Sequence, residues 1–303
     1  MPKFEEIEEL ETERSNPKTS EIDKMDSLEI AKIMNAEDKT IALAVEKTLE
    51  SISKLAEKIS SAIKNGGRCV YVGAGTSGRV AMIDAVETVP TFNLPVGTFT
   101  TILAGGPEAM IRSLENVEDD WGGGAQEILK NNVSSKDVVI GISASGRTPF
   151  VMGAIEKARQ LGALTGSISN VGNAKLSSMV DIPIEVITGP EVVTGSTRLK
   201  AGTAQKMVLN MLSTISMIKL GKVYKNLMVD VTPINEKLVI RAINIIVSAT
   251  GVSKSKAEEL LKVSGMRPKV AIIMALTNSS VKEAEELLGK SGGSVRMAIS
   301  KGG

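Results

Sequence analysis

Five short apolar runs, separated by helical patterns, constrain the fold of this chain more than any other feature of its sequence. Runs that are apolar almost throughout are typical of strands buried on both faces of a parallel sheet. Helical patterns follow the first four, and right-handed crossovers would place those helices on both faces. We therefore predict an α/β fold with a doubly wound, mostly parallel five-stranded sheet. The predicted strands are 68–73, 97–106, 136–143, 163–169 and 180–188.

Two of these strands run into nearly the same turn. The segments "GAGTSGR" (73–79) and "GISASGR" (141–147) share their first glycine and the ending Ser-Gly-Arg at a constant offset of 68 residues. Two halves of a duplicated unit would produce this match, and so would two loops that bind one ligand. A tight turn that packs a strand against a helix is the simpler alternative for either turn alone. Its recurrence argues against that alternative.

The composition of the two turns favours binding of an anion. Backbone N–H groups and the helix dipole at the start of a helix attract anions, most often phosphate. The Walker pattern is missing, and Gly-x-Gly-x-x-Gly at 73, 75 and 78 is by itself a weak sign of dinucleotide binding. Ligands of such sheets bind beyond the carboxyl ends of the strands, where both turns are expected. The candidate phosphate-binding residues are Thr76, Ser77, Gly78, Ser143, Ser145, Gly146 and Thr148.

The absence of histidine from all 303 residues restricts the possible chemistry. It excludes Ser-His-Asp and Cys-His nucleophiles, histidine-ligated zinc and histidine bases. Acid–base catalysis near pH 7 must then come from Glu, Asp, Lys, Tyr or Cys. We expect activity to need no metal or other cofactor and to survive chelation.

Charge and hydropathy indicate a cytoplasmic protein. Lysine and arginine number 36 against 35 acids, and aromatic residues make up 2%, so nothing suggests nucleic-acid binding. No apolar run approaches the ~20 residues of a membrane span, and the acidic N-terminus does not resemble a signal peptide. The single cysteine, Cys69, excludes an internal disulfide framework and is typical of a reducing compartment.

The chain is expected to have three parts. Residues 1–65 would form an arm, up to about residue 26, then the segment "LEIAKIM" (28–34) with Ser27 as its N-cap, and a long helix over 36–65. Residues 66–230 would hold the sheet and a Met-rich helix over 198–221. Residues 231–303 would form a small helical module, with helices at 234–250, 254–264, 268–277 and 280–289. The apolar surface of helices 36–65 and 198–221 suggests a homodimer with each pocket near the subunit boundary.

Further segments give the chain a specific family resemblance. The two turns resemble the paired loops of the SIS fold, a flavodoxin-like fold that binds phosphosugars. With the additional segments, the chain is similar to the N-acetylmuramic acid 6-phosphate etherases from about residue 10 to the C-terminus. These segments are "DAVETVPTF" (84–92), "LENVEDD" (114–120), "ISASGRTP" (142–149), "GPEVVTGSTRLKAGTAQKMVLNMLST" (189–214) and "GKVYKNLMVDV" (221–231).

The resemblance implies a carbon–oxygen lyase of cell-wall sugar recycling. Such an enzyme removes D-lactate from carbon 3 of its substrate by elimination and then adds water, which yields N-acetylglucosamine 6-phosphate. By motif position Glu87 and Glu118 match the family's catalytic glutamates. We assign Glu118 as the base at carbon 2, and Glu87 as the acid for lactate departure and the base for water. Without the resemblance, Glu118 would be interpreted as a surface charge and Glu87 as a cap or loop charge.

Four cations are candidates for contacts to the phosphate or the lactyl carboxylate: Arg79, Arg147, Arg198 and, most favoured, Lys200. Structural ion pairs are the alternative for each. The chain departs from the family at Thr88-Val89, where Cys-Pro is usual, and at Asn170-Val171 within "SISNVGN" (167–173), where Ile-Ser-Cys-Asn-Pro-Gly is usual. Other functions compatible with the two turns are an aldose–ketose isomerase and a non-catalytic phosphosugar sensor.

Overall fold

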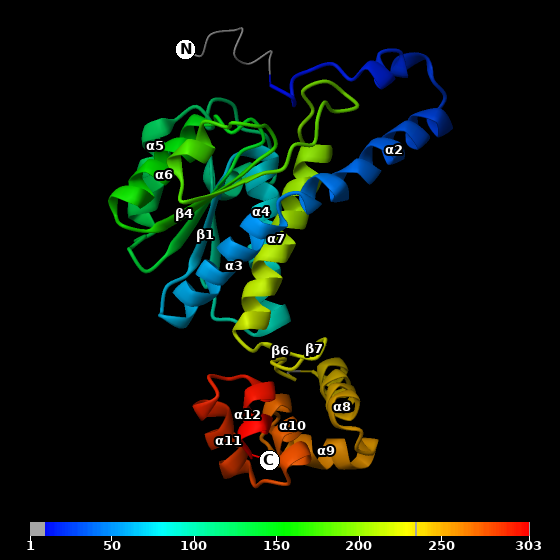
Figure 1. The fold of residues 1–303 in the computed structure, drawn as a ribbon, viewed down its shortest axis with the longest axis vertical. Helices are drawn as coiled ribbons and strands as arrows, with labels where there is room; N and C mark the ends of the chain where they lie inside the picture. The colour runs from blue at the N-terminus through cyan, green and yellow to red at the C-terminus, as the bar shows by residue number, and fades with distance from the viewer. Residues whose placement is uncertain (1–9, 234, 303) are drawn as a thin grey trace. The chain divides into compact units, whose positions relative to one another are not determined.

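The five predicted strands form one parallel sheet in the computed structural model, which describes residues 10–233 and 235–302 (Figure 1). The strand order is β2-β1-β3-β4-β5, which confirms the prediction of a doubly wound, flavodoxin-like sheet. Each strand lies inside its predicted run because the flanking residues make turns. The strands are β1 (Cys69–Gly73), β2 (Phe99–Leu103), β3 (Val138–Ile142), β4 (Leu164–Ser169) and β5 (Ile182–Glu185).

The two similar turns follow neighbouring strands. β1 and β3 pair in register, with Gly73 opposite Ile142, although β2 lies between them in the chain. The chain first moves outward from β1 to β2 and then returns past β1 to β3, which makes the gap between β1 and β3 the topological switch point. Ligands of such sheets bind at this point, beyond the carboxyl ends of the strands.

Helices cover both faces of the sheet (Figure 1). On one face, α5 (Trp121–Lys130) and α6 (Pro149–Gln160) pack on a buried cluster that includes Val72, Val139 and Ile155. On the other face, α3 (Leu49–Lys64) contacts β1, β3 and β5, together with α4 (Gly75–Phe92) and α7 (Lys200–Lys219). Side chains alternate across each strand, and both sides are therefore buried.

The prediction of one helix over 36–65 is wrong. α2 (Ser27–Glu46) ends before α3 begins, and Thr48 between them leaves the helical region with φ −113° and ψ 5°. The Thr48 hydroxyl donates to the Val45 carbonyl at 2.8 Å, a bond that competes with continuation of the helix. At the other end the N-cap is Asp26 rather than Ser27, and Asp26 forms a capping box with Glu29.

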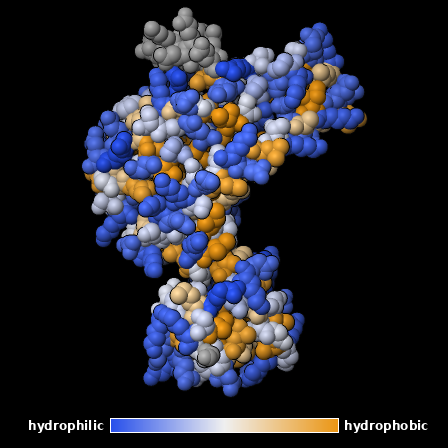
Figure 2. Space-filling model, viewed as in Figure 1, coloured by the Kyte–Doolittle hydropathy of each residue, from blue (hydrophilic) through white to orange (hydrophobic). Residues whose placement is uncertain are grey.

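The arm predicted for residues 1–26 can be followed from Leu10, since residues 1–9 lie outside the described part of the chain. It is not simply extended. Short 3₁₀ helices, η1 (Pro17–Thr19) and η2 (Ile22–Lys24), lead into α2. Apolar side chains on α2 and α3 remain exposed among polar ones, as Figure 2 shows for α2. Leu28 is 63% exposed, Leu43 61% and Leu49 46%.

The remainder of the chain is helical and has its own core. The chain divides into one compact unit, up to Val86 and over Gly97–Ser213, and a second over Glu87–Val96 and from Thr214 onward. The four predicted C-terminal helices are present, and a fifth, α12, was not predicted. The elements are β6 (Val223–Tyr224), β7 (Leu227–Met228), α8 (Glu236–Thr250), α9 (Lys254–Val263), α10 (Pro268–Thr277), α11 (Val281–Lys290) and α12 (Val295–Gly302).

The predicted Met-rich helix over 198–221 is observed as α7.

Across residues 10–233 and 235–302, no single helix has both the length and the apolar composition needed to cross a membrane. Among these residues, α8 and α9 meet the length and composition criteria only when they are taken together, and the chain bends by 111° between them.

Candidate active site

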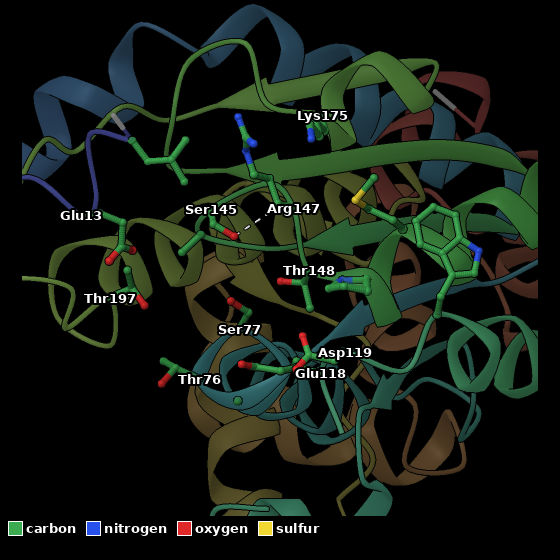
Figure 3. Close-up of a pocket in the computed structure, with 17 residues that line it drawn as sticks. Glu13, Thr76, Ser77, Glu118, Asp119, Ser145, Arg147, Thr148, Lys175 and Thr197 are labelled. Atoms are coloured by element: carbon green, nitrogen blue, oxygen red, sulfur yellow. Dashed lines mark hydrogen bonds between the residues drawn. The ribbon is translucent and has the colours of Figure 1, made fainter. Parts of the chain in front are cut away.

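A cavity of about 1000 Å³ lies at the carboxyl edge of the sheet, where the two turns leave β1 and β3 (Figure 3). Both turns contribute to its wall, as do the N-terminal arm, the segment before α5 and the loop before α7. The described residues that line it are Leu10, Glu13, Ala74, Gly75, Thr76, Ser77, Glu118, Asp119, Trp121, Ala144, Ser145, Arg147, Thr148, Pro149, Met152, Lys175 and Thr197.

The first turn is tight because two glycines approach each other. A Cβ on Gly78 would lie 2.9 Å from the Gly73 carbonyl oxygen and 2.3 Å from Leu103 Cδ1. Without side chains at these positions, α4 begins at Gly75, directly beyond β1. Thr76 and Ser77 therefore occupy the first turn of the helix, whose backbone N–H groups have no partner within the helix. The turn thus presents N–H donors and two hydroxyls to the cavity.

The second turn gathers three hydroxyls. Ser143 Oγ lies 2.8 Å from Thr148 Oγ1 and 3.4 Å from Ser145 Oγ. Ser143 is only 2% exposed, so it contacts the Ser145 and Thr148 hydroxyls from the interior side of the turn. Thr148 is the N-cap of α6, and Gly146 has a φ of +62°, which a side chain would strain. Ser145 and Thr148 are thereby held facing the cavity.

Four of the predicted phosphate-binding residues thus line one cavity: Thr76, Ser77, Ser145 and Thr148. Gly78, Ser143 and Gly146 are buried and shape the two turns behind this lining. Their contacts with a phosphate stay a prediction.

Glu118 lines the same cavity beside Asp119. Its backbone carbonyl accepts a hydrogen bond at 2.9 Å from the backbone N–H of Phe150, the second residue of α6. This bond ties the segment before α5 to the helix that follows the second turn. The Glu118 carboxylate is consequently placed on the side of the cavity opposite Arg147 (Figure 3).

Glu87 lies elsewhere. It is an exposed residue of α4, twelve positions after Gly75. Since a helix rises ~1.5 Å per residue, this is about 18 Å along the helix from the first turn. The described residues that line the cavity do not include Glu87. Its catalytic role stays a prediction.

The four candidate cations occupy different positions. Arg147 lines the cavity, whereas Arg198 is exposed and outside the described lining. Arg79 donates from Nε to the Ala109 carbonyl at 2.9 Å and from Nη2 to the Arg112 carbonyl at 3.1 Å, so it links α4 to the segment after β2.

Lys200, the most favoured of the four, is 2% exposed. Its Nζ lies 2.7 Å from Glu37 Oε2 on α2. Its contact with substrate stays a prediction, and the described lining of the cavity does not include it.

Glu37 forms ion pairs with the buried Lys200 and with the exposed Lys18. Its other oxygen lies 2.9 Å from Lys18 Nζ on the arm. Burial raises the pKa of Glu37, but hydrogen bonds from Lys200 and Lys18 outweigh that effect and lower its pKa to about 2. Nearby, the fully buried Glu191 accepts from the backbone N–H groups of Lys200 at 2.9 Å and Ala201 at 3.0 Å. It neutralises the start of α7.

Several lining residues were not predicted. Lys175 follows β4, and its only signal was its position after the carboxyl end of a strand. Leu10 and Glu13 belong to the arm, for which no periodicity or motif indicated contact with the sheet. Trp121 begins α5, and its Nε1 donates to Glu156 Oε2 at 3.2 Å.

Comparisons with known proteins agree on the fold. The family model described as the glucokinase regulatory protein N-terminal SIS domain matches residues 51–159, and the SIS domain model matches residues 122–215. Among solved structures, a phosphoheptose isomerase from Francisella tularensis superposes with a TM-score of 0.51 at 20% identity, over 64% of this chain and 100% of that chain. The predicted SIS fold is confirmed.

Curated relatives decide the family. The N-acetylmuramic acid 6-phosphate etherase of Petrotoga mobilis is 54% identical over 266 residues, which cover 88% of this chain and 89% of that protein. This chain belongs to the N-acetylmuramic acid 6-phosphate etherase family. Its counterpart in Clostridioides difficile is 50% identical over 88% of each chain. The etherase resemblance inferred from the sequence is confirmed.

The departures from the etherase pattern lie inside the fold. Thr88 is buried in α4, and Val171 is fully buried against Leu10 and Ala174. The side-chain amide of Asn170 donates to the Val186 carbonyl at 3.1 Å and accepts from Gln205 Nε2 at 2.9 Å. These side chains have buried partners, so the two departures are accommodated by packing within this etherase.

Proposed function

We propose that this chain cleaves the D-lactyl ether of N-acetylmuramic acid 6-phosphate, giving N-acetylglucosamine 6-phosphate and D-lactate. It would act as a carbon–oxygen lyase in cell-wall sugar recycling. The supporting observation is one cavity that combines two anion-binding turns with Glu118, in a chain about half identical to etherases over 88% of its length. We assign the phosphosugar-binding domain to residues 66–230 and a helical module to 231–303.

The phosphate would bind between the two turns. Thr76 and Ser77 at the start of α4, and Ser145 and Thr148 at the start of α6, offer hydroxyl and N–H donors from two helix N-termini. Ser143 would fix the hydroxyls of the second turn. Arg147 can donate two hydrogen bonds to the lactyl carboxylate, with Lys175 as a second cation on that side of the cavity.

The reaction needs a base and an acid. In the ring-opened sugar, the aldehyde at carbon 1 acidifies the hydrogen on carbon 2. Glu118 removes that proton, the bond between carbon 3 and the ether oxygen breaks, and Glu87 protonates the departing lactate oxygen. Carbons 2 and 3 are then joined by a double bond. Glu87 is now ionised and takes a proton from a water molecule while the oxygen of that water adds to carbon 3. Carbon 2 regains a proton from Glu118.

Glu87 would be supplied by a second copy of the chain. It is exposed, about 18 Å along α4 from the first turn, and flanked by Ile83 and Val86, which are 50% and 57% exposed. Apolar side chains exposed beside a catalytic carboxylate are expected where another subunit packs. We therefore propose a homodimer in which each cavity is completed by the partner's α4.

Lactate release tests the proposed function directly. The purified protein is incubated with N-acetylmuramic acid 6-phosphate, and free D-lactate and sugar products are measured. We expect stoichiometric D-lactate and N-acetylglucosamine 6-phosphate. A ketose product without lactate would indicate an isomerase instead, and binding without any turnover would indicate a sensor.

The lone buried cysteine, Cys69, suits a cytoplasmic reaction.

A further inference from the structure

One wall of the cavity comes from the N-terminal arm, defined here as residues 10–20. Leu10 and Glu13 line the cavity, and Figure 3 shows the Glu13 side chain beside Thr197 and on the same side as Ser145. The etherase reaction as derived above uses neither arm residue. Their position raises the question of what a carboxylate on this wall contributes.

The arm is anchored on both sides of Glu13. Before it, Leu10 is 8% exposed and packs with Val171 and Ala174, and Thr12 is fully buried. After it, the Asn16 side chain accepts from the backbone N–H of Lys18 at 3.1 Å and caps η1. Buried contacts at both ends fix the backbone between them, so Glu13 is held in place rather than carried on a loose terminus.

After Glu13, the arm contacts the same carboxylate as the start of α7. Lys18 pairs with Glu37 at 2.9 Å, and the same carboxylate pairs with Lys200 at 2.7 Å at the start of α7. The loop leading into α7 carries Gly195 and Thr197. The Glu37 carboxylate therefore contacts both the exposed Lys18 on the arm and the buried Lys200 after this loop.

Glu13 lies close to this loop. A Cβ on Gly195 would lie 3.2 Å from Glu13 Oε2, and the Thr12 hydroxyl donates to Glu13 Oε1 at 3.4 Å. Glycine at position 195 thus leaves room for the carboxylate beside the cavity. An ionised carboxylate only accepts hydrogen bonds, and it repels the phosphate and the lactyl carboxylate. Of the groups on the sugar, it can favour only hydroxyl or amide donors.

We infer that Glu13 is a specificity-determining residue that accepts a hydrogen bond from the hydroxyl on carbon 4 of the phosphosugar. This inference rests on the proposed function. In the proposed pose, the phosphate of carbon 6 binds the two turns, Glu118 reaches carbon 2, and the carbons between them lie on the side of the cavity that carries Glu13. Carbon 5 carries the ring oxygen in the closed sugar. Carbon 4 is then the position between the phosphate and the reacting carbons that offers a free hydroxyl in both ring and open forms.

Binding of the product separates this inference from the proposed reaction, because it needs no turnover. Affinity for N-acetylglucosamine 6-phosphate is measured by calorimetry for the wild type, Glu13→Ala and Glu13→Gln. A hydrogen bond to a charged group contributes ~1.5–3 kcal/mol, so Glu13→Ala should weaken binding about 10- to 100-fold. Glu13→Gln keeps an acceptor oxygen and should recover most of the affinity. Glu21→Ala, at an exposed carboxylate beyond the arm, is the matched control and should bind normally.

The 4-deoxy product identifies the hydroxyl. The wild type should bind it as weakly as Glu13→Ala binds the full product, and Glu13→Ala should show no further loss with it. Losses that multiply when the variant and the deoxy sugar are combined would overturn the inference, as would unchanged affinity in Glu13→Ala. Failure of the wild type to release lactate would instead overturn the proposed function, and the binding comparison would still decide the role of Glu13.

Discussion

At the scale of single residues, the candidate site combines hydroxyls, cations and carboxylates that come from different segments of the chain. Ser143 is the clearest case of a residue that acts on its neighbours. Buried beneath the second turn, it touches the hydroxyls of Ser145 and Thr148, which face the cavity. Glu118 is positioned through its backbone, because its carbonyl is bonded to α6 and its carboxylate remains available.

The two glutamates should give different results in deuterated water. Glu118→Gln should abolish both lactate release and exchange of the proton on carbon 2. Glu87→Gln should block lactate release but leave some exchange, since the proton can still be removed and returned. Each loss of lactate release should be ~100- to 10,000-fold. Exchange is followed by NMR. If exchange disappears only in Glu87→Gln, the two roles are reversed.

Ser145→Ala should affect binding more than chemistry. The phosphate is remote from carbons 2 and 3, so the lost hydrogen bond should raise KM by about 10-fold or more and change kcat less. Steady-state kinetics with the phosphorylated sugar measure both constants. Equal use of a sugar lacking the phosphate would show that the two turns do not bind it.

At the scale of helices and strands, buried ion pairs connect elements far apart in the sequence. Lys200 and Glu37 are 163 residues apart, yet they join the start of α7 to the middle of α2 at 2.7 Å. Glu191 caps α7 from the loop before it. These contacts hold the loop that carries Thr197 and the arm that carries Glu13 against the sheet.

Glu37→Gln should destabilise the fold in a pH-dependent way. The Glu37 pKa falls from its ordinary 4.5 to about 2 in the folded chain. Its ionised form therefore contributes stability that is present in full above about pH 4.5 and lost as pH falls through 2. Removing one partner of a buried pair costs ~3–5 kcal/mol, so the variant should unfold more easily near neutral pH.

Urea unfolding measures this effect, from pH 7 down to the lowest pH at which both proteins fold. The stability difference between wild type and Glu37→Gln should shrink as pH falls below 4.5. A difference that stays constant over this range would show that the Glu37 charge does not stabilise the fold.

Local patterns were sufficient to predict most of these elements. All five strands and the four C-terminal helices from α8 to α11 follow from apolar runs, periodicity and turn residues. The break between α2 and α3 was missed because it depends on the bond between the Thr48 hydroxyl and Val45, which periodicity does not reveal. The arm was predicted, but its packing was missed for another reason. That packing depends on the contact between Leu10 and Val171, which is set by the tertiary fold.

The site was predictable to a similar extent. The two turns follow from motifs at strand ends, whereas Glu118 was assigned only from the family resemblance, and the fold brings them to one cavity. Lys200 was favoured because it lies in a specific string, but no local pattern indicates that Glu37 pairs with it from 163 residues away. Lys175 and Glu13 enter the cavity from segments without a motif.

At the scale of the whole molecule, we propose that two copies of the chain complete each site, with Glu118 lining the cavity of one copy and the exposed Glu87 coming from the other. Mixing inactive Glu87→Gln and Glu118→Gln proteins tests this. In a mixed dimer one cavity would hold both changes and the other neither. If subunits exchange freely, about half the dimers are mixed, and about a quarter of the wild-type activity should return.

Light scattering on the wild type should report a dimeric mass. A monomeric mass with full wild-type activity, or a mixture that stays inactive after complete subunit exchange shown by tagged chains, would mean that both glutamates act from one chain.

The fate of solvent oxygen distinguishes elimination and water addition from any other route to lactate. The wild type is incubated with N-acetylmuramic acid 6-phosphate in ¹⁸O-labelled water, and both products are analysed by mass spectrometry. Elimination followed by water addition breaks the bond between carbon 3 and the ether oxygen. D-lactate should therefore be released without label, and N-acetylglucosamine 6-phosphate should carry one ¹⁸O on carbon 3. Label in the lactate, or no lactate at all, would contradict the proposed reaction.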